Sequence, residues 1–209
     1  MTTVRLLLSC ALMAFLPAAA SGQELPMHPE WLEDLRLGGY VIVFRHCLTV
    51  SDQVKTDSMS RGDLPPDRQL SEQGRAQAKA IGAALHKLNI PVEGVLTSVT
   101  RRALDTGKLF GFDEVNAMAE LTESGPALTI EESNKRSEAL RKLIARWPQP
   151  DNNLLIVTHK PNIIDAFGKD WRDVHECEAS VFVPDGNGGS RMIVRVLAEE
   201  WGKLASPSK

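Results

Sequence analysis

Three short runs of apolar residues, separated by longer stretches of helical periodicity, constrain the fold of this 209-residue chain. They lie at 39–44, 94–98 and 153–158. The first and third are continuous rather than alternating, which is typical of strands buried on both faces of a parallel sheet. Strands that alternate with helices along a chain indicate the α/β class, with a mostly parallel sheet.

Helix-start signals and a turn motif complete this outline. Ser71 and Thr129 precede stretches with apolar residues at helical spacing, and Thr129 is followed three residues later by a glutamate, as in a capping box. Another helix is expected over 102–110. Two further apolar runs, 179–183 and 192–196, flank a glycine-rich turn, which predicts a hairpin. We therefore expect a three-layer α/β/α domain with a mostly parallel central sheet and a C-terminal β-hairpin.

The first 22 residues have the pattern of a secretory signal peptide. Arg5 precedes an apolar run at 6–16, and small residues follow at 18–22. The apolar run is too short to span a bilayer as a helix. We expect cleavage after Ala20 or Gly22, so the mature protein is expected to be periplasmic or secreted. An uncleaved membrane anchor is the alternative.

The remaining residues, 23–209, are expected to form a single domain, with 26–33 as a lead-in to it. The formal net charge of the whole chain is −3. General nucleic-acid binders are normally basic, so we expect no nucleic-acid partner. No segment after the signal is apolar enough to span a membrane, so no stable membrane association is expected once the signal is removed. Any attraction for anions must come from individually placed arginines.

Three polar residues, far apart in the sequence, follow closely after predicted strands. They are His46, Arg102 and His159. In open α/β sheets, ligands bind beyond the carboxyl ends of the strands. The order of elements therefore delivers these three residues to one edge of the sheet and predicts a site there.

Four blocks of sequence occur in order along the chain: Arg45-His46, Leu70 to Ala78, Ser98 to Thr106 with Arg102 inside it, and Val157-Thr158-His159. In this order they resemble the motifs of the histidine phosphatase superfamily, which includes the phosphoglycerate-mutase-like and acid-phosphatase-like enzymes. The resemblance extends from about Tyr40 to the hairpin, and the segment from Cys177 to Ala179 is similar to small exported members. It implies a phosphatase that acts on phosphate monoesters, with no cofactor and no metal.

The resemblance assigns a role to each strand-end residue. His46 matches the nucleophile that becomes a phosphohistidine, and Arg45 and Arg102 match the phosphate-binding arginines. His159 matches the second histidine, which contacts the transferred phosphate, and a protonated ring there would stabilise charge on the equatorial oxygens. A neutral imidazole is a competent nucleophile, and nearby arginines are expected to lower its pKa. Guanidinium groups match the oxygens of phosphate.

The leaving alkoxide needs a proton from a general acid. Some members of the family carry an acid directly after the second histidine, but Lys160 stands there in this chain. Others use a glutamate in a Leu-x-Glu segment, which Glu123 matches. Glu123 is therefore the expected acid, and Glu120 is the alternative.

Cys47 and Cys177 depart from the family pattern, which often has glycine or alanine at the first position and glycine at the second. Both positions are expected to flank the site. We hypothesise a Cys47–Cys177 disulfide that braces it, and two free thiols are the rival interpretation.

The same residues argue against two other classes of enzyme and leave two alternatives open. A cysteine phosphatase would need an arginine six residues after Cys47, where Gln53 stands. A zinc hydrolase could use His46 and His159, but no typical ligand spacing is present. A non-catalytic protein that binds a phosphorylated ligand and a phosphomutase remain alternatives. The substrate is expected to be a phosphorylated small molecule or macromolecule, selected by the loops at 48–68 and 112–129.

Overall fold

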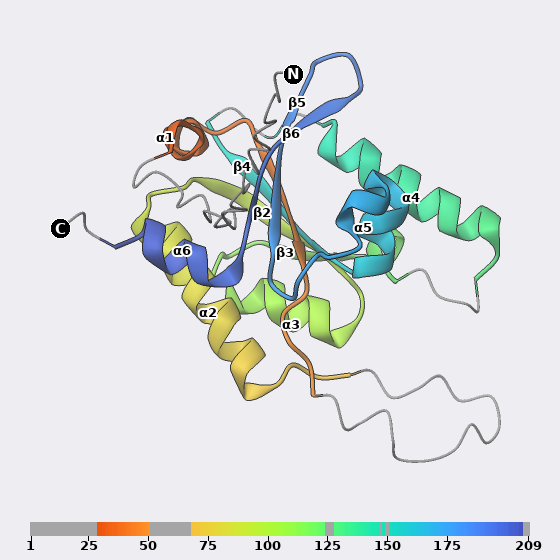
Figure 1. Cartoon of the computed structure of the whole chain (residues 1–209), viewed down its shortest axis with the longest axis horizontal. Helices are drawn as coiled ribbons and strands as arrows, with labels where there is room; N and C mark the ends of the chain where they lie inside the picture. Colours follow the sequence, from red (N-terminus) through yellow and green to blue (C-terminus); the bar gives the residue numbers. More distant parts are fainter. Residues whose placement is uncertain (1–28, 51–67, 124–127, 147, 149–150, 207–209) are drawn as a thin grey trace, which may run out of the picture.

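A computed structural model describes residues 29–50, 68–123, 128–146, 148 and 151–206. The predicted signal peptide, most of the loop at 48–68 and part of the stretch at 112–129 lie outside the described residues. Within the described residues, one six-stranded sheet forms the centre of the molecule (Figure 1). Its strands are β1 (Val41–Arg45), β2 (Val92–Ser98), β3 (Val115–Met118), β4 (Asn153–Thr158), β5 (Ala179–Pro184) and β6 (Ser190–Val196).

The strand order is β3-β2-β4-β1-β5-β6. The first four strands in this order are mutually parallel, while β5 pairs antiparallel with β1 and β6 pairs antiparallel with β5. The mostly parallel sheet and the C-terminal hairpin are thus confirmed. Because β1, β2 and β4 are adjacent and parallel, their carboxyl ends meet at the same edge.

Helices cover both faces of the sheet (Figure 1). They are α1 (Glu30–Leu37), α2 (Glu72–Lys87), α3 (Arg101–Leu109), α4 (Ile130–Ile144), α5 (Lys160–Phe167) and α6 (Ala198–Leu204), with short 3₁₀ turns η2 (Ala119–Leu121) and η3 (Lys169–Trp171). The core on one face contains side chains of α1, α2, α3 and α6, and the core on the other contains those of α4 and α5. The three-layer architecture is confirmed.

Strand β1 shows why the apolar runs are continuous. Ile42 and Phe44 belong to the core under α2 and α6, whereas Val41 and Val43 belong to the core under α4 and α5. All four side chains are buried, because successive residues of a strand point to opposite faces and both faces are covered.

The predicted N-caps form as expected. Ser71 Oγ accepts a hydrogen bond of 3.0 Å from the backbone N–H of Gly74 at the start of α2. Thr129 and Glu132 form a reciprocal capping box at the start of α4. Both caps satisfy backbone donors that the first turn of a helix leaves unpaired.

The interpretation of 26–33 as a lead-in is wrong from residue 30 onward, because α1 begins at Glu30. Leu32 and Leu35, three residues apart, are fully buried and hold this short helix on the sheet. Its N-cap is Pro29, which makes no side-chain capping bond, so the sequence carries no capping residue there. The helix follows from tertiary packing rather than from a local signal.

Helix α2 passes very close to the end of α3. A Cβ atom on Gly82 would collide with the backbone of Phe110, the C-cap of α3. Glycine at this point lets the two helices approach, and this approach fixes α3 and its first turn relative to α2.

No helix among the described residues is long and apolar enough to cross a membrane.

Candidate active site

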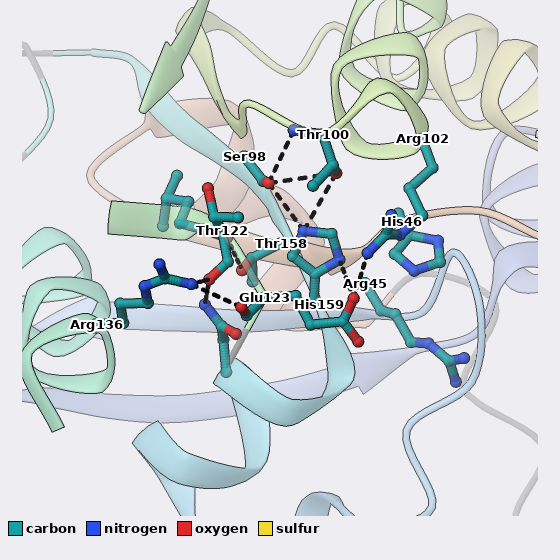
Figure 2. Close-up of polar contacts among 12 residues, drawn as sticks. Arg45, His46, Ser98, Thr100, Arg102, Thr122, Glu123, Arg136, Thr158 and His159 are labelled. Carbon is teal, nitrogen blue, oxygen red and sulfur yellow. Dashed lines mark hydrogen bonds and ion pairs between the residues drawn. The ribbon is translucent and has the colours of Figure 1, made fainter. Parts of the chain in front are cut away.

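The two histidines lie next to each other at the carboxyl edge of the sheet (Figure 2). His46 follows β1 and His159 follows β4, and the centroids of their rings are 5.3 Å apart. Both side chains are buried, as is that of Arg102 in the first turn of α3. The structure thus brings together the three residues that the sequence places after strands.

The backbone of the sheet fixes the orientation of the His46 ring. The backbone N–H of His46 donates to Thr158 O at 3.0 Å and so extends the pairing of β1 with β4. Nδ1 of the ring lies 2.8 Å from the carbonyl oxygen of Cys47. Because a carbonyl oxygen only accepts, Nδ1 carries the hydrogen and Nε2 keeps its lone pair. His46 is therefore held in the tautomer of a nucleophile.

His46 is also neutral. Burial, together with the charges of Arg102, Arg45 and Arg68, lowers the pKa of its ring to about 3, against the opposing hydrogen bond to Cys47. The expected effect of the arginines is present, but burial is the larger cause.

His159 is fully buried, and burial lowers the pKa of its ring to about 2, with His46, Arg102 and other cations acting in the same direction. His159 is therefore neutral in this structure, because an imidazolium ion without water around it and close to arginine side chains is unfavourable. Nε2 of His159 lies 2.8 Å from Ser98 Oγ and 3.3 Å from Thr100 Oγ1.

Glu123 lies between Arg102 and His159 (Figure 2). Arg102 donates a hydrogen bond to one of its carboxylate oxygens, Oε2, and the same oxygen is 3.9 Å from Nδ1 of His159. Arg136 of α4 holds this loop from behind by donating to the backbone carbonyls of Thr122 and Glu123, at 3.1 and 2.6 Å. The predicted acid is thus placed at the histidines, whereas Glu120 is exposed.

The guanidinium of Arg45 contacts different partners from that of Arg102. Its Nη1 donates to Val174 O at 2.7 Å, and its Nη2 forms an ion pair with Glu176. Burial lowers the pKa of Arg45, and Glu176 opposes this shift. Figure 2 shows its guanidinium pointing away from Glu123. Its assignment to phosphate binding therefore stays a prediction, while its contacts in this structure are with residues 174–176.

Cys47 and Cys177 form a disulfide, with both residues buried and their Cα atoms 4.3 Å apart. Cys177 has a positive φ of 60°, and its N–H points at the carbonyl oxygens of Arg45 and His46, at 3.2 and 3.3 Å. The bond joins the end of β1 to the turn that carries Glu176. Because the sulfur of Cys47 is oxidised, this residue offers no thiolate for a cysteine-phosphatase reaction.

Several residues at the site were not assigned a role from the sequence. Ser98 and Thr100 contact His159, Arg136 holds the Glu123 loop, and Arg68 acts on both histidines through its charge. Ser98 lies within a block that resembles the family, so a signal for it was present. Arg136 is one of several cations on an amphipathic helix, and nothing in the sequence distinguishes it.

The other histidines have separate surroundings or lie outside the described residues. His86 stacks on Phe112 with ring centroids 4.4 Å apart, His175 is exposed, and His28 is not among the described residues. Arg101 is mostly exposed and pairs with Asp105 at 3.7 Å, which agrees with the choice of Arg102 as the inward-facing arginine.

The described residues also form a cavity away from the histidines. A cavity of about 290 Å³ is lined by residues of β2, β3 and β4 and their surroundings, but it contains neither His46 nor His159. Among the described residues, no three His, Cys, Asp or Glu side chains group so that they could hold a metal ion.

Comparison with known proteins identifies a family for this chain. The sequence model of the histidine phosphatase superfamily, branch 1, matches residues 41–149. A search of curated proteins found no match.

Solved structures with the same fold include the protein histidine phosphatase SixA complexed with tungstate, with a TM-score of 0.54, 17% identity, and 77% of this chain and 98% of the other covered. A mutant phosphoserine phosphatase from Entamoeba histolytica in complex with phosphoserine has a TM-score of 0.52, 14% identity and coverage of 77% and 98%. YhfR of Bacillus stearothermophilus has a TM-score of 0.53, 18% identity and coverage of 74% and 95%. At these identities the structures show a shared fold.

Proposed function

This chain belongs to the histidine phosphatase superfamily, and from that premise we propose that it is an exported phosphomonoester hydrolase that acts through a phosphohistidine on His46, without a metal. The observation that carries the proposal is the state of His46. Its ring is neutral, its Nδ1 hydrogen is bound to the Cys47 carbonyl, and its Nε2 lone pair is available beside Arg102 and His159.

In the first step, Nε2 of His46 attacks the phosphorus of the substrate. The new P–N bond forms as the P–O bond to the alcohol breaks, and the alkoxide takes a proton from the general acid. In the second step, water attacks the phosphohistidine, the P–N bond breaks, and inorganic phosphate leaves. The attacking water loses a proton to the carboxylate, which restores the general acid, and His46 returns to its neutral state.

Arg102 supplies the main positive charge for the phosphoryl oxygens. It is buried, so its charge acts at low dielectric, and phosphoryl transfer depends chiefly on positioning and such charge stabilisation. In this structure it donates a hydrogen bond to the Glu123 carboxylate. A bound phosphate replaces this carboxylate at Arg102, and Glu123 then stands beside the leaving oxygen as the acid.

Export is supported by two independent features of the chain. One is the signal-like pattern of its first 22 residues. The other is the Cys47–Cys177 disulfide, because disulfides persist in oxidising compartments and are rare in the bacterial cytosol. A cleaved, oxidised enzyme would meet phosphorylated small molecules or macromolecules outside the cytoplasm.

The test compares mature wild type with His46→Ala on p-nitrophenyl phosphate and a panel of phosphate monoesters, in buffer with and without a chelator. We expect wild-type turnover with chelator present and a loss of roughly three orders of magnitude or more in His46→Ala. His86→Ala is the matched control, since His86 lies away from the site against Phe112, and it should keep full activity.

Rapid quenching in alkali should trap phosphate on His46 during turnover. Phosphate binding without any turnover would favour the non-catalytic alternative, and transfer of phosphate to an added alcohol in preference to water would favour a phosphomutase. Turnover that survives His46→Ala would exclude the proposed mechanism.

A further inference from the structure

Two hydroxyl groups surround one nitrogen of His159. Nε2 is 2.8 Å from Ser98 Oγ and 3.3 Å from Thr100 Oγ1, and the three atoms form a buried polar cluster at the end of β2 (Figure 2). Nδ1 at the opposite side of the ring is also buried, and it has no hydrogen-bond partner among the residues that the structure describes. The two sides of the ring therefore have very different surroundings.

A neutral imidazole carries one hydrogen, which is on either Nδ1 or Nε2. Serine and threonine hydroxyls both donate and accept, so their distances alone do not choose between the tautomers. The backbone N–H of Thr100, however, donates to Ser98 Oγ at 3.2 Å. This bond uses one acceptor position of the Ser98 oxygen. The hydrogen of the Ser98 hydroxyl has two acceptors within reach, Thr100 Oγ1 at 3.3 Å and His159 Nε2 at 2.8 Å, and Nε2 is the nearer one.

The surroundings of Nδ1 select one tautomer. The Glu123 carboxylate lies on this side of the ring, with Oε2 at 3.9 Å from Nδ1. A lone pair on Nδ1 would face this negative oxygen and be repelled, whereas an N–H would be attracted to it. A phosphate that takes the place of the carboxylate at Arg102 presents oxygens of the same kind.

We propose that Ser98, assisted by Thr100, is a positioning residue that sets the tautomer of His159. The Ser98 hydroxyl donates to Nε2, the ring hydrogen stays on Nδ1, and the neutral His159 donates that N–H to the phosphoryl oxygens. The identity of the bound anion rests on the proposed function, whereas the tautomer itself rests on the contacts of His159.

The two histidines then share one tautomer but face the phosphate with opposite ends. In His46 the Nδ1 hydrogen is bound to a carbonyl and the Nε2 lone pair attacks. In His159 the Nε2 lone pair is bound to a hydroxyl and the Nδ1 hydrogen is presented. Neither ring has to gain a proton, so the same arrangement operates at any pH at which both rings stay neutral.

Imidazole ¹⁵N NMR of the mature, full chain measures the tautomer directly. Wild-type His159 should appear as the Nδ1–H form between pH 5 and 8, a range chosen from the low pKa of His159. In Ser98→Ala, part or all of the population should move to the Nε2–H form. The affinity for inorganic phosphate and for orthovanadate should fall roughly tenfold, the effect of losing one good hydrogen bond.

Ser137→Ala is the matched control. Ser137 is another buried serine, and its hydroxyl donates to the carbonyl of Asn134 in the same helix at 3.0 Å. This variant should leave the His159 tautomer and phosphate affinity unchanged. Thr100→Val removes the second hydroxyl and should produce a smaller shift than Ser98→Ala, while Thr100→Ser should behave as wild type.

An Nε2–H signal for His159 in wild type would overturn the inference, and so would an unchanged tautomer in folded Ser98→Ala. If Ser98→Ala does not fold, the wild-type spectrum and the comparison of Thr100→Val with Thr100→Ser still test the tautomer of His159. None of these readouts needs turnover, so a failure of this inference is distinct from a failure of the proposed phosphatase activity.

Discussion

At the scale of single residues, the buried histidines couple the chemistry of the site to the stability of the fold. His46 and His159 are neutral because burial lowers the pKa of each ring, to about 3 and about 2. An unfolded chain exposes both rings, whose pKa values then return to about 6.5. Between these values the unfolded chain binds protons that the folded protein does not.

We predict that the free energy of unfolding decreases as the pH falls from about 6.5 toward 3, with each of the two histidines contributing. Urea unfolding of wild type and His159→Asn at pH 7 and pH 5 tests this. The decrease between these pH values should be smaller in the variant by about 2 kcal/mol, since one titrating group is gone. A decrease in His159→Asn equal to that in wild type would contradict the prediction.

The loss of activity on removing the Glu123 carboxyl group should be larger for substrates whose leaving group must be protonated. In Glu123→Gln, kcat for an alkyl phosphate such as β-glycerophosphate should fall roughly a hundredfold, the usual contribution of a general acid. Turnover of p-nitrophenyl phosphate should fall much less, because nitrophenolate leaves without protonation.

The exposed neighbour gives the control for this comparison. Glu120→Gln should behave as wild type on both substrates, because Glu120 is exposed on η2. Equal losses on both substrates in Glu123→Gln would assign Glu123 to its ion pair with Arg102 rather than to proton transfer.

At the scale of elements, the turn before β5, which carries Glu176 and Cys177, contacts the site although it is distant from β1 in the sequence. It is attached to the end of β1 by the disulfide, by the N–H of Cys177 and by the ion pair of Glu176 with Arg45. Behind it, the buried Glu178 carboxylate accepts from Arg195 and from the backbone N–H of His175. The sequence indicated the cysteine pair but not the partners of Arg45, because nothing local marks contacts between residues about 130 positions apart.

Removing the disulfide should loosen this turn. We predict that a Cys47→Ala, Cys177→Ala double variant loses roughly 2–5 kcal/mol of stability, the usual range for a crosslink that closes a long loop. KM should rise more than kcat falls, since Arg45 and the turn are displaced while His46 stays in the sheet. Urea unfolding and steady-state kinetics measure both effects. The disulfide itself is checked by treating unreduced mature protein with an alkylating agent and measuring its mass. Alkylation of both cysteines would show that they are free thiols.

The contact between α2 and α3 predicts a contrast between two helical glycines. Gly82→Ala should destabilise the protein by about 1–3 kcal/mol, because the added Cβ meets the backbone of Phe110, which cannot move aside cheaply. Gly202→Ala in α6 should be neutral or stabilising by up to ~1 kcal/mol, because no atom lies within 4 Å of the added Cβ. Thermal unfolding of both variants checks this, and equal effects would show that the contact is not tight.

At the scale of the whole molecule, the features that could be predicted from the sequence are those encoded by patterns several residues long. The buried strands are continuous apolar runs, and the site follows because parallel strands end at the same edge. The helices α1 and α6 and the edge strand β3 were not predicted. Each is short, and α1 is held by two leucines rather than by a capping residue.

The site could be predicted in outline, but not in its electrostatics. The positions of His46, Arg102 and His159 follow from strand ends, whereas the charge of His159 depends on how deeply the fold buries it. Likewise, the contacts of Arg45 with Val174 and Glu176 depend on where the turn before β5 lies. Such quantities arise from packing between distant segments and have no local signature.

Processing of the whole chain is the remaining prediction. Expressed in a bacterium with an export pathway, the protein should be recovered from the periplasm or medium with a new N-terminus at Ser21 or Gln23. N-terminal sequencing or intact mass checks the cleavage point. Recovery of the uncleaved chain in the membrane fraction would instead support the anchor alternative.

The division of the aromatic residues between the two faces of the sheet makes the protein suited to optical spectroscopy. Trp31 and Trp201 contact each other on the face of α1 and α6, whereas Trp171 packs on Phe167 and Phe182 on the opposite face. Trp171 also lies 6.0 Å from the guanidinium of Arg195, which is bonded to Glu178 in the turn beside Arg45. In variants that keep a single tryptophan, fluorescence can therefore follow each layer separately, and the emission of Trp171 can report changes in the turn that contacts Arg45.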